Sequence, residues 1–423
     1  MAVQGHRLLN ELTARSDGSQ SDIDAAAVFD PDVFASSGAP FDAFGRLRQN
    51  APVHPVDLPG IEPTVWLCTG YDDVRAVSRD DDLFASRFGN TLVAVEMVET
   101  SAMLAGIDPP QHTHFRKLIN RAFTPRNVLR LEESIRKTAR NIVDDVVDKG
   151  EFDAVPDVSA AISLSVIADV MGVPRADRHE IFRWSNAIGT LGIEDEDYAP
   201  DPAAIGDALG EMFGYCADLV AQRRAEGLKD DILSALLAAE VDGVGLNADQ
   251  LNEFFLLLSV AGNETTRNTL SHAILALSEH PDQRAALAAD PALIPGAVEE
   301  MLRWATPVLH FRRTVMATTE LSGQTLNEGD WVVIHYLSAN RDESAFEKPH
   351  EFDIRRDDAV KHVAFGGGGT HFCLGAQLAK LEIRVMLEEL YRRVPSLAVT
   401  GPPARLRSSF FHGIKRLPCS TGV

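Results

Sequence analysis

The chain has 423 residues, of which 45% are hydrophobic and 24% are charged, a balance typical of globular proteins. Acidic residues outnumber basic ones by 62 − 40 = 22, so repulsion from phosphate disfavours nucleic acid and anionic membrane as partners. The four scattered cysteines fit a reducing compartment, and we expect a cytoplasmic protein without a signal peptide or a membrane span.

The predicted elements describe a mainly α protein with a smaller β-rich part. Residues 1–25 are polar and predict a flexible tail, and 26–423 predict a single domain. Strand-like and helical pieces, such as 64–68 and 71–77, alternate up to about residue 100. Apolar spacing of three and four then predicts helices from about 115 to 305, interrupted by an acidic loop at 185–205. Alternating patterns predict strands between 310 and 340, and a final long helix at about 375–392 precedes a tail of strands and turns.

Four segments carry residues suited to chemistry, and each taken alone is ambiguous. The first, Asp108-Pro109-Pro110-Gln111-His112, leads into a basic helix that bears Arg116, although a turn before an ordinary solvated helix would look the same. In the second, Ala261-Gly262-Asn263-Glu264-Thr265-Thr266, an acid and a hydroxyl interrupt a long apolar helix that begins near Leu251. A threonine bonded to its own helix and a solvent-facing glutamate would also explain this segment.

In the third segment, Glu300 and Arg303 stand three residues apart on one helix face and are able to pair, as many surface residues do. The fourth contains four glycines, 366–369, followed by Cys373 just before a helix. Such glycines could cradle a phosphate, but the Lys-Ser/Thr of a P-loop is absent. Helix-start N–H groups could instead stabilise a thiolate that ligates heme iron, whereas an isolated cysteine is more often a small buried hydrophobe.

Together and in this order, the four segments resemble the cytochrome P450 family of heme-thiolate monooxygenases, from about residue 30 to about 418. Residues 262–268, 366–375 and 412–418 look like the branch that oxidises sterols and methyl-branched lipids, with relatives acting on terpenoids. The resemblance implies a cytochrome P450 fold, with heme b held between the long oxygen-activating helix and the helix after the cysteine loop.

The resemblance also implies roles for individual residues. Cys373 would be the axial ligand of the heme iron, and Glu264 and Thr265 would be catalytic in oxygen activation. The remaining assignments are heme contacts by His112, Arg116, Arg313, His371, Ala261 and Phe365, a structural triad of Glu300, Arg303 and Arg356, and a substrate pocket lined by Leu257, Val260, Ala261, Val308, Leu309 and Phe410.

Physical chemistry agrees with these roles. Heme carries two carboxylates, so an acidic protein must place local cations against them, and arginine supplies paired donors. Oxygen activation consumes two protons in a dry pocket, which requires a hydroxyl and a buried acid such as Thr265 and Glu264, and Gly262 is expected to open the helix there for oxygen and water. Phe365 lies eight residues before Cys373, one more than the commonest spacing in the family, and the extra glycine is expected to let it keep its place under the heme.

We expect a monooxygenase that takes a steroid, a terpenoid or a branched lipid together with O2. Electrons would come from NAD(P)H through a separate ferredoxin reductase and a ferredoxin that docks on a basic patch of Lys117, Arg121, Arg126 and Lys380. Three alternatives remain at this stage: a natural-product enzyme acting on a polyketide-like intermediate, a peroxide-driven hydroxylase, and a heme-binding sensor without turnover. The intact Glu264-Thr265 pair argues against the last two, because neither needs a proton relay.

Overall fold

A computed structural model describes residues 18–58, 61–92, 104–122, 125–189, 193, 195, 197, 202–229, 231–241 and 243–422. The helices are α2 (Gln20–Phe29), α3 (Pro31–Ser37), α4 (Phe41–Asn50), α5 (Tyr71–Arg79), α7 (Gln111–Ala122), α8 (Pro125–Arg130), α9 (Glu132–Lys149), α10 (Ala161–Val170), α11 (Arg178–Gly189), α12 (Pro202–Glu226), α13 (Ile232–Ala238), α14 (Ala248–Glu279), α15 (Pro281–Ala289), α16 (Ile294–Ala305), α17 (Tyr336–Ala339) and α18 (Ala376–Arg393). Short 3₁₀ turns cover Leu104–Gly106, Arg175–Asp177, Pro291–Leu293 and Asp357–Lys361, and a π-helical turn covers Val155–Ala160.

The strands are β1 (Val53–Val56), β2 (Val65–Cys68), β3 (Phe84–Ala85), β4 (Glu151–Asp153), β5 (Glu240–Val241), β6 (Val244–Gly245), β7 (His310–Val315), β8 (Thr319–Leu321), β9 (Gln324–Leu326), β10 (Trp331–His335), β11 (Ala398–Val399), β12 (Ala404–Arg405), β13 (Ile414–Arg416) and β14 (Pro418–Ser420). The mainly α fold with a smaller β-rich part is therefore confirmed. None of the helices in the described ranges has the length and hydrophobicity needed to cross a bilayer.

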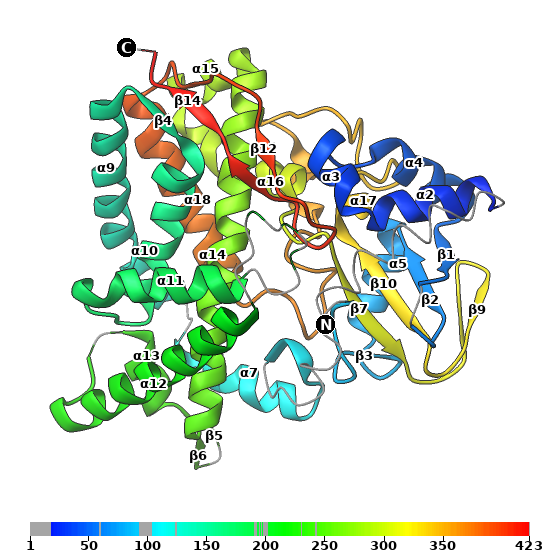
Figure 1. Ribbon diagram of the computed structural model, residues 1–423, viewed down its shortest axis with the longest axis horizontal. Helices are drawn as coiled ribbons and strands as arrows, with labels where there is room; N and C mark the ends of the chain where they lie inside the picture. Colours follow the sequence, from blue (N-terminus) through cyan, green and yellow to red (C-terminus); the bar gives the residue numbers. More distant parts are fainter. Residues whose placement is uncertain are drawn as a thin grey trace.

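The main sheet and the large helical part lie side by side (Figure 1). The sheet has the order β1-β2-β10-β7-β3, in which only β2 and β10 are parallel. Helix α5 buries Val74 and Val77 against one face of the sheet, and α2 and α4 bury Val28 and Phe44 against the other. Alternating side chains of the strands therefore enter two separate apolar clusters.

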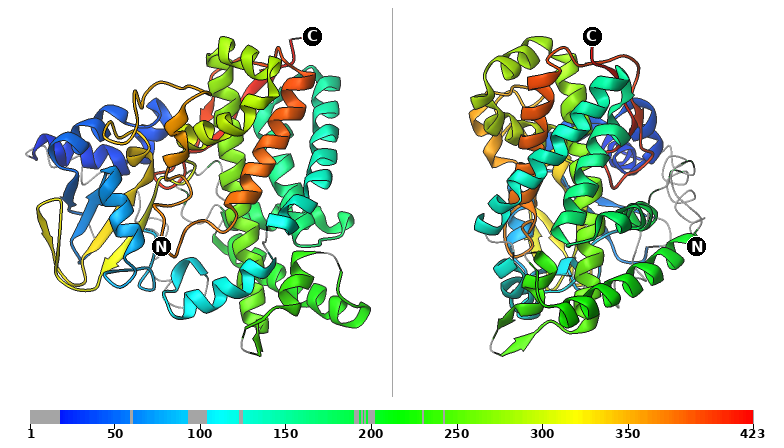
Figure 2. Two further views of the ribbon diagram at one scale, coloured as in Figure 1. Left: turned by 180° about the vertical axis from the view of Figure 1, so that it is seen from behind. Right: turned by 90° about the vertical axis from the view of Figure 1, so that its left-hand side faces the viewer.

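Helix α14 is the axis of the helical part, packed among α10, α11, α12, α16 and α18. Asn247 caps its first turn in a reciprocal pair with Gln250, and the helix ends at Glu279, two residues before Pro281. Figure 2 shows the chain before α18 crossing from the sheet side of the molecule to the start of α18, beside the middle of α14. This crossing brings the glycine-rich segment to the helix that carries Glu264 and Thr265.

The N-terminal helix starts earlier than the sequence suggested. Helix α2 begins at Gln20, inside the segment 1–25 that was expected to be a flexible tail. Ser19 accepts a hydrogen bond from the Asp22 N–H, and the Asp22 carboxylate accepts one from the Ser19 N–H. This capping pair gives residues 20–25 a helical start although apolar periodicity is weak there, and residues 1–17 lie outside the described part of the chain.

Candidate active site

The loop that carries Cys373 is closed by its own backbone. The Cys373 N–H donates to the Phe365 carbonyl over 2.9 Å, and the Gly366 N–H donates to the Val363 carbonyl over 2.9 Å. Phe365 packs edge-on against Phe372, with ring centroids 6.3 Å apart. The longer spacing between Phe365 and Cys373 is thus accommodated within one hydrogen-bonded loop.

The glycines of this loop are required by their closeness to α5. A Cβ atom at Gly367 would lie 2.5 Å from Ser78 Oγ, and one at Gly369 would lie 2.4 Å from the Ser78 carbonyl oxygen. Gly369 also has φ +76°, which disfavours other residues. The glycine run therefore lets the cysteine loop lie directly on the end of α5, a reason that the sequence did not reveal.

Cys373 lies three residues before the first residue of α18, and the residue as a whole is partly exposed. Burial raises the pKa of the Cys373 thiol, while the N–H groups of Gly375 and Ala376 and the charge of Arg116 act in the opposite direction. Backbone donors and a cation are the groups that stabilise a thiolate. The other three cysteines of the chain are fully buried, and burial is the main cause of the raised pKa of each.

Three side chains assigned to the heme carboxylates are buried or half-buried without an acidic partner. His112 is 1% exposed, and within the described part of the chain neither of its ring nitrogens has a hydrogen-bond partner. In the same described ranges Arg116 and Arg313 form no ion pair with a carboxylate, and the Arg313 Nη1 donates to the carbonyl of Arg312 over 2.8 Å. Buried polar groups without partners are costly, so these three side chains suit an anionic group held among them.

Asp108, to which the sequence analysis assigned no role, fixes the position of His371. The His371 Nε2 lies 3.2 Å from Ser86 Oγ and 3.6 Å from Asp108 Oδ1, and its ring lies 4.6 Å from that of His112. Burial alone would raise the pKa of Asp108, but hydrogen bonds from His371 and from the N–H groups of Ser86 and Arg87 lower it to about 2. Asp108 therefore orients His371 toward His112.

Glu300, Arg303 and Arg356 form a buried ionic network. The Glu300 carboxylate lies 2.6 Å from Arg303 Nε and 3.3 Å from Arg356 Nε, and Glu300 and Arg303 are 0% exposed. The Asp353 N–H also donates to Glu300 over 3.0 Å, and Arg303 donates to the carbonyls of Asn340 and Pro349. The structure thus brings together the three residues of the predicted triad and ties them to the segment that leads to the cysteine loop.

Helix α14 has one face that is partly exposed. Ala261 is exposed in the middle of the helix, and Leu257 and Thr265, one turn away on either side, are only partly buried. Residues four apart share a helix face, so these three form a continuous stripe, with Val260 at its edge. The stripe is apolar apart from the Thr265 hydroxyl.

The expectation that Gly262 opens the helix was wrong, because α14 continues through this position. A Cβ atom at Gly262 would lie 2.3 Å from Cδ1 of Ile167 on α10, so the glycine is needed for close helix packing. The Thr265 hydroxyl donates to the Ala261 carbonyl over 2.7 Å, which is the local bond that the sequence allowed as an alternative. This bond occupies the hydroxyl proton and leaves the Thr265 oxygen on the open face.

Glu264 does not face solvent. It is 1% exposed, forms a short ion pair with Arg267 one turn along α14, and lies under the end of α11 at Gly189. The sequence analysis missed Arg267, although Glu264 and Arg267 repeat the Glu-x-x-Arg spacing of Glu300 and Arg303. Glu264 and Thr265 therefore offer a buried acid and a hydroxyl on adjacent faces of one helix.

Of the remaining predicted pocket residues, the side chains of Val308 and Phe410 lie together, whereas the side chain of Leu309 enters another cluster. Val308 and Phe410 are partly buried and pack in a cluster with Phe411 and Ile193. Leu309 is 0% exposed and belongs to the apolar cluster under the sheet, because adjacent residues of an extended chain point to opposite sides. Leu309 therefore contributes to the core and not to a pocket wall.

The predicted basic patch is only partly described. Lys117 is exposed on α7, whereas the side chains of Arg121 and Arg126 lie outside the described residues. Lys380 lies 2.7 Å from Glu299 and 5.6 Å from the Phe365 ring centroid, so a carboxylate matches its charge. The positive charge of the patch at Lys380 is therefore smaller than the sequence suggested.

The residues around Cys373 fit heme b. Cys373 would supply the thiolate, and His112, Arg116 and Arg313 would hold carboxylates, because both ring nitrogens of His112 lack a partner and the two arginines pair with no carboxylate in the described part of the chain. Ala261 presents a small side chain on the open α14 face, which allows a flat ligand to approach the helix. The donor set thus matches the cofactor that the sequence resemblance implied.

Comparison with known proteins agrees with this arrangement. A family model described as Cytochrome P450 matches residues 56–291 and 292–394. A methyl-branched lipid omega-hydroxylase of Mycobacterium tuberculosis is 42% identical over 387 residues, which cover 89% of this chain and 90% of that protein. A steroid C26-monooxygenase of Rhodococcus jostii is 38% identical over 398 residues, covering 91% of this chain and 82% of that protein.

Solved structures give the same picture. A Mycobacterium marinum cytochrome P450 in complex with pseudoionone superposes with a TM-score of 0.85 at 38% identity, covering 92% of this chain and 97% of that one. A Bacillus megaterium cytochrome P450 in complex with corticosterone gives a TM-score of 0.81 at 32% identity, covering 91% of this chain and 98% of that one.

Proposed function

The chain belongs to the cytochrome P450 family, and from this premise we propose that it hydroxylates the methyl-branched end of a lipophilic molecule, with electrons from a separate ferredoxin. It is a heme b monooxygenase of the branch that hydroxylates lipids and steroids. The reaction is R–H + O2 + 2 e⁻ + 2 H⁺ → R–OH + H2O. The heme, when bound, supplies the iron at which O2 is reduced.

The observation that carries the proposal is the stripe of Leu257, Ala261 and Thr265 on α14. The stripe is apolar except for the hydroxyl of Thr265. An apolar surface of this kind favours hydrocarbon over sugars, nucleotides or charged peptides. Val308 and Phe410, from distant parts of the chain, would add further apolar wall. A hydrocarbon lying along the stripe would bring a C–H bond close to Thr265 and exclude water from that space.

Glu264 and Thr265 would deliver the protons. Glu264 is buried beside Arg267, so a proton taken up at its carboxylate would be handed on inside the protein and not exchanged at the surface. The Thr265 Oγ1, already bonded to the Ala261 carbonyl, would pass protons on the open face of the helix. Arg267 would act as a positioning residue for the Glu264 carboxylate.

A methyl-branched substrate is supported by what the named relatives share. One acts at the omega end of methyl-branched lipids, one at C26 of steroids, and the similar solved structure binds pseudoionone, an isoprenoid ketone. Each of these molecules has a hydrocarbon chain with methyl branches. The proposal further includes that the protein acts in the cytoplasm and that a ferredoxin reductase supplies the ferredoxin with electrons.

A spectral titration tests the substrate class, because a ligand that displaces the water on the heme iron shifts the Soret band without turnover. We expect tight shifts with a methyl-branched fatty acid and with a steroid that keeps its branched side chain. The matched controls are a straight-chain fatty acid of equal carbon number and a steroid without the side chain, which should bind more weakly. Equal shifts with branched and straight chains, or tight shifts with polar ligands alone, would contradict the proposal.

A further inference from the structure

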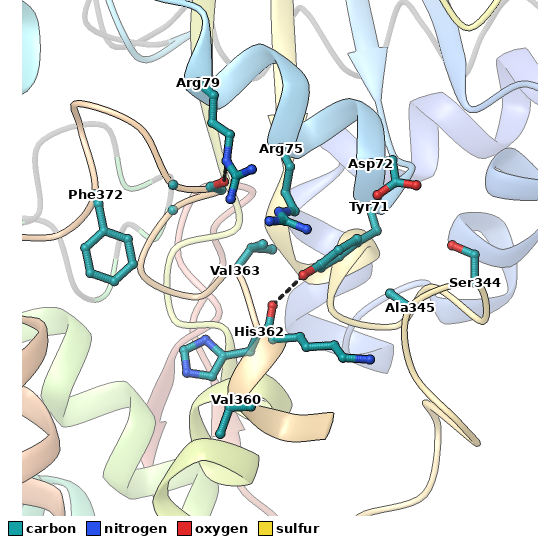
Figure 3. A pocket seen from close by; sticks show the side chains of 14 residues that line it. Tyr71, Asp72, Arg75, Arg79, Ser344, Ala345, Val360, His362, Val363 and Phe372 are labelled. Carbon is teal, nitrogen blue, oxygen red and sulfur yellow. Dashed lines mark hydrogen bonds between the residues drawn. The ribbon is translucent and has the colours of Figure 1, made fainter. Parts of the chain in front are cut away.

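The hollow shown in Figure 3 does not continue the apolar stripe on α14. This hollow has a volume of about 500 Å³ and lies between α5 and the segment before Cys373. Its lining includes Arg75, Arg79 and Lys361, and none of its described lining residues belongs to α14. A hydrocarbon lying along the stripe therefore ends elsewhere.

A small recess at the start of α14 does continue the stripe. It has a volume of about 20 Å³, and one of its lining residues is Leu257, the first residue of the stripe. The other apolar walls include Leu104, Phe115 and Ile119, which come from α7 and the turn before it. Two of the lining residues are polar, Gln250 and Glu253.

Glu253 lies on the same line of α14 as the stripe. Residues four apart share a helix face, so Glu253 stands one turn before Leu257 and extends the row that ends at Thr265. It precedes Thr265 by 265 − 253 = 12 residues, which is about 18 Å along the helix axis at about 1.5 Å per residue. An extended lipid whose branched end lies at Thr265 would thus bring its other end to Glu253.

The two polar groups of the recess are a donor and an acceptor. The Gln250 Oε1 accepts a hydrogen bond from the Asn247 N–H over 2.9 Å, which turns the Gln250 Nε2 group, a donor, to the other side of the amide. The Glu253 carboxylate is an acceptor. A hydroxyl group can donate to Glu253 and accept from Gln250, whereas a ketone oxygen can only accept, and a carboxylate accepts and also repels Glu253.

The size of the recess favours the same group. A cavity must offer about 10–15 Å³ to hold one water molecule, so a recess of about 20 Å³ has room for a single oxygen atom of this kind. A hydroxyl group meets this limit, while a carboxylate brings two oxygen atoms. Size and hydrogen bonding therefore select the same end group.

We propose that Glu253 and Gln250 bind a hydroxyl group at the end of the substrate remote from the carbon that is hydroxylated. The inference rests on the proposed function, which places the branched end of the substrate at Thr265. The hydroxyl donates to the Glu253 carboxylate and accepts from the Gln250 Nε2, and Leu257 packs against the carbon skeleton next to it. The substrate class is thus an uncharged branched lipid alcohol, such as a sterol with a free hydroxyl on its ring system and an intact side chain.

The first test compares the dissociation constants of cholestanol and cholestanone, measured by the Soret shift of the heme-loaded protein. These two steroids share the skeleton and the side chain and differ only in the oxygen function at the remote end. Cholestanol should bind about five- to tenfold more tightly, because the ketone cannot donate to Glu253. A methyl-branched fatty acid should likewise bind less tightly than the corresponding alcohol. Dissociation constants of the two steroids that agree within about twofold would overturn the proposal.

The second test uses variants of the recess. Glu253→Leu removes the acceptor, so the preference for cholestanol over cholestanone should fall below about twofold. Glu253→Gln keeps an oxygen acceptor of the same shape but removes the charge, so it should bind the branched fatty acid more tightly than the wild type does. Asp249→Asn is the matched control for charge, because Asp249 is exposed on the first turn of the same helix and does not line the recess.

Asp249→Asn should leave both the steroid preference and the affinity for the fatty acid as in the wild type. A preference for cholestanol that survived in Glu253→Leu, or a gain in fatty-acid affinity that was equal in Asp249→Asn and Glu253→Gln, would contradict the proposal. Unchanged thermal unfolding and an unchanged carbon monoxide spectrum show that an effect is local. The comparison of the two steroids with the wild type decides the matter even if a variant is unstable.

The comparison of branched with straight chains separates this inference from the proposed function. That preference is set at the Thr265 end of the stripe, so it should be the same in Glu253→Leu as in the wild type. Equal binding of branched and straight chains would contradict the proposed function, while the ratio of the cholestanol and cholestanone dissociation constants still decides the role of Glu253 and Gln250.

Discussion

The loop that carries Cys373 and the α14 face that carries Thr265 serve one site, but they are built in different ways. The loop is fixed by bonds between residues close in sequence, such as Cys373 with Phe365, and by glycines that touch α5. The α14 face is a partly exposed stripe whose further walls come from separate segments, such as Val308 and Phe410. The comparison teaches that the closure of the cysteine loop is specified locally, although its position on α5 is not, whereas the walls of the substrate side come from distant parts of the chain.

The largest expected effect is on the cysteine side. Cys373→Ala should abolish the thiolate-type spectrum of the reduced carbon monoxide complex, because Cys373 alone among the four cysteines is not fully buried and receives helix-start N–H groups. Single replacements of Cys68, Cys216 and Cys419 by alanine are the controls and should leave the spectrum in place. A thiolate-type spectrum that persisted in Cys373→Ala would show that the ligand had been misassigned.

The next effect concerns the support of the cysteine loop. Glu300→Gln should lower the free energy of unfolding by about 3–5 kcal/mol, because Arg303 would keep a buried charge without a carboxylate and Arg356 would keep only Asp358, 3.4 Å away. Glu299→Gln is the neighbouring control: Glu299 bonds to the partly exposed Lys380 and to His362, a glutamine can still accept a hydrogen bond from each, and the change should cost about 1 kcal/mol or less. Chemical denaturation of the two variants measures the difference, and equal losses would show that the Glu300 network is not special.

On the α14 side, Thr265→Ala should keep heme and ligand binding but lower the rate of product formation by ~10²-fold, because a proton-transfer group is lost. Oxygen that is not used for hydroxylation should leave as peroxide. Thr269→Ala is the matched control, since Thr269 makes the same kind of bond to a carbonyl one turn away but is buried. If the yield of product per electron fell equally in both variants, the hydroxyl of Thr265 would serve only to bond its own helix and would have no role in proton transfer. Glu264→Gln should slow turnover more than it weakens ligand binding.

The smallest effect is a pH dependence on the substrate side. His310, which packs against Phe410, is buried, and burial lowers its pKa to about 4 although a bond with Ser409 opposes the shift. An unfolded histidine titrates near 6.5, so below that pH the unfolded state binds more protons and acid destabilises the fold. At pH 5 this histidine alone should cost about 2 kcal/mol relative to pH 7. His310→Gln should lose less stability between the two pH values than the wild type, and an equal loss would exclude His310 as a cause.

The sequence predicted the local features of the site better than the distant ones. Cys373 and the Glu300–Arg303 pair were found because their short local motifs, taken together with the other segments, resemble those of the cytochrome P450 family. Arg267 was missed although it stands three residues from Glu264, and Gly262 was read as a break because sequence does not show that Ile167 lies against it. Asp108, which holds His371, and Ser78, which the glycine run touches, are more than 260 residues before their partners. Contacts over such separations follow from the fold and not from any local pattern.

The most direct test of the account is the origin and position of the oxygen in the product. The heme-loaded protein, supplied with a ferredoxin system and a methyl-branched fatty acid under ¹⁸O2, should give a product that mass spectrometry shows to carry one ¹⁸O atom at the branched end of the chain. A hydroxyl oxygen derived from water, or oxidation elsewhere on the chain, would contradict the claim that the α14 face positions a branched hydrocarbon for insertion of one atom of O2.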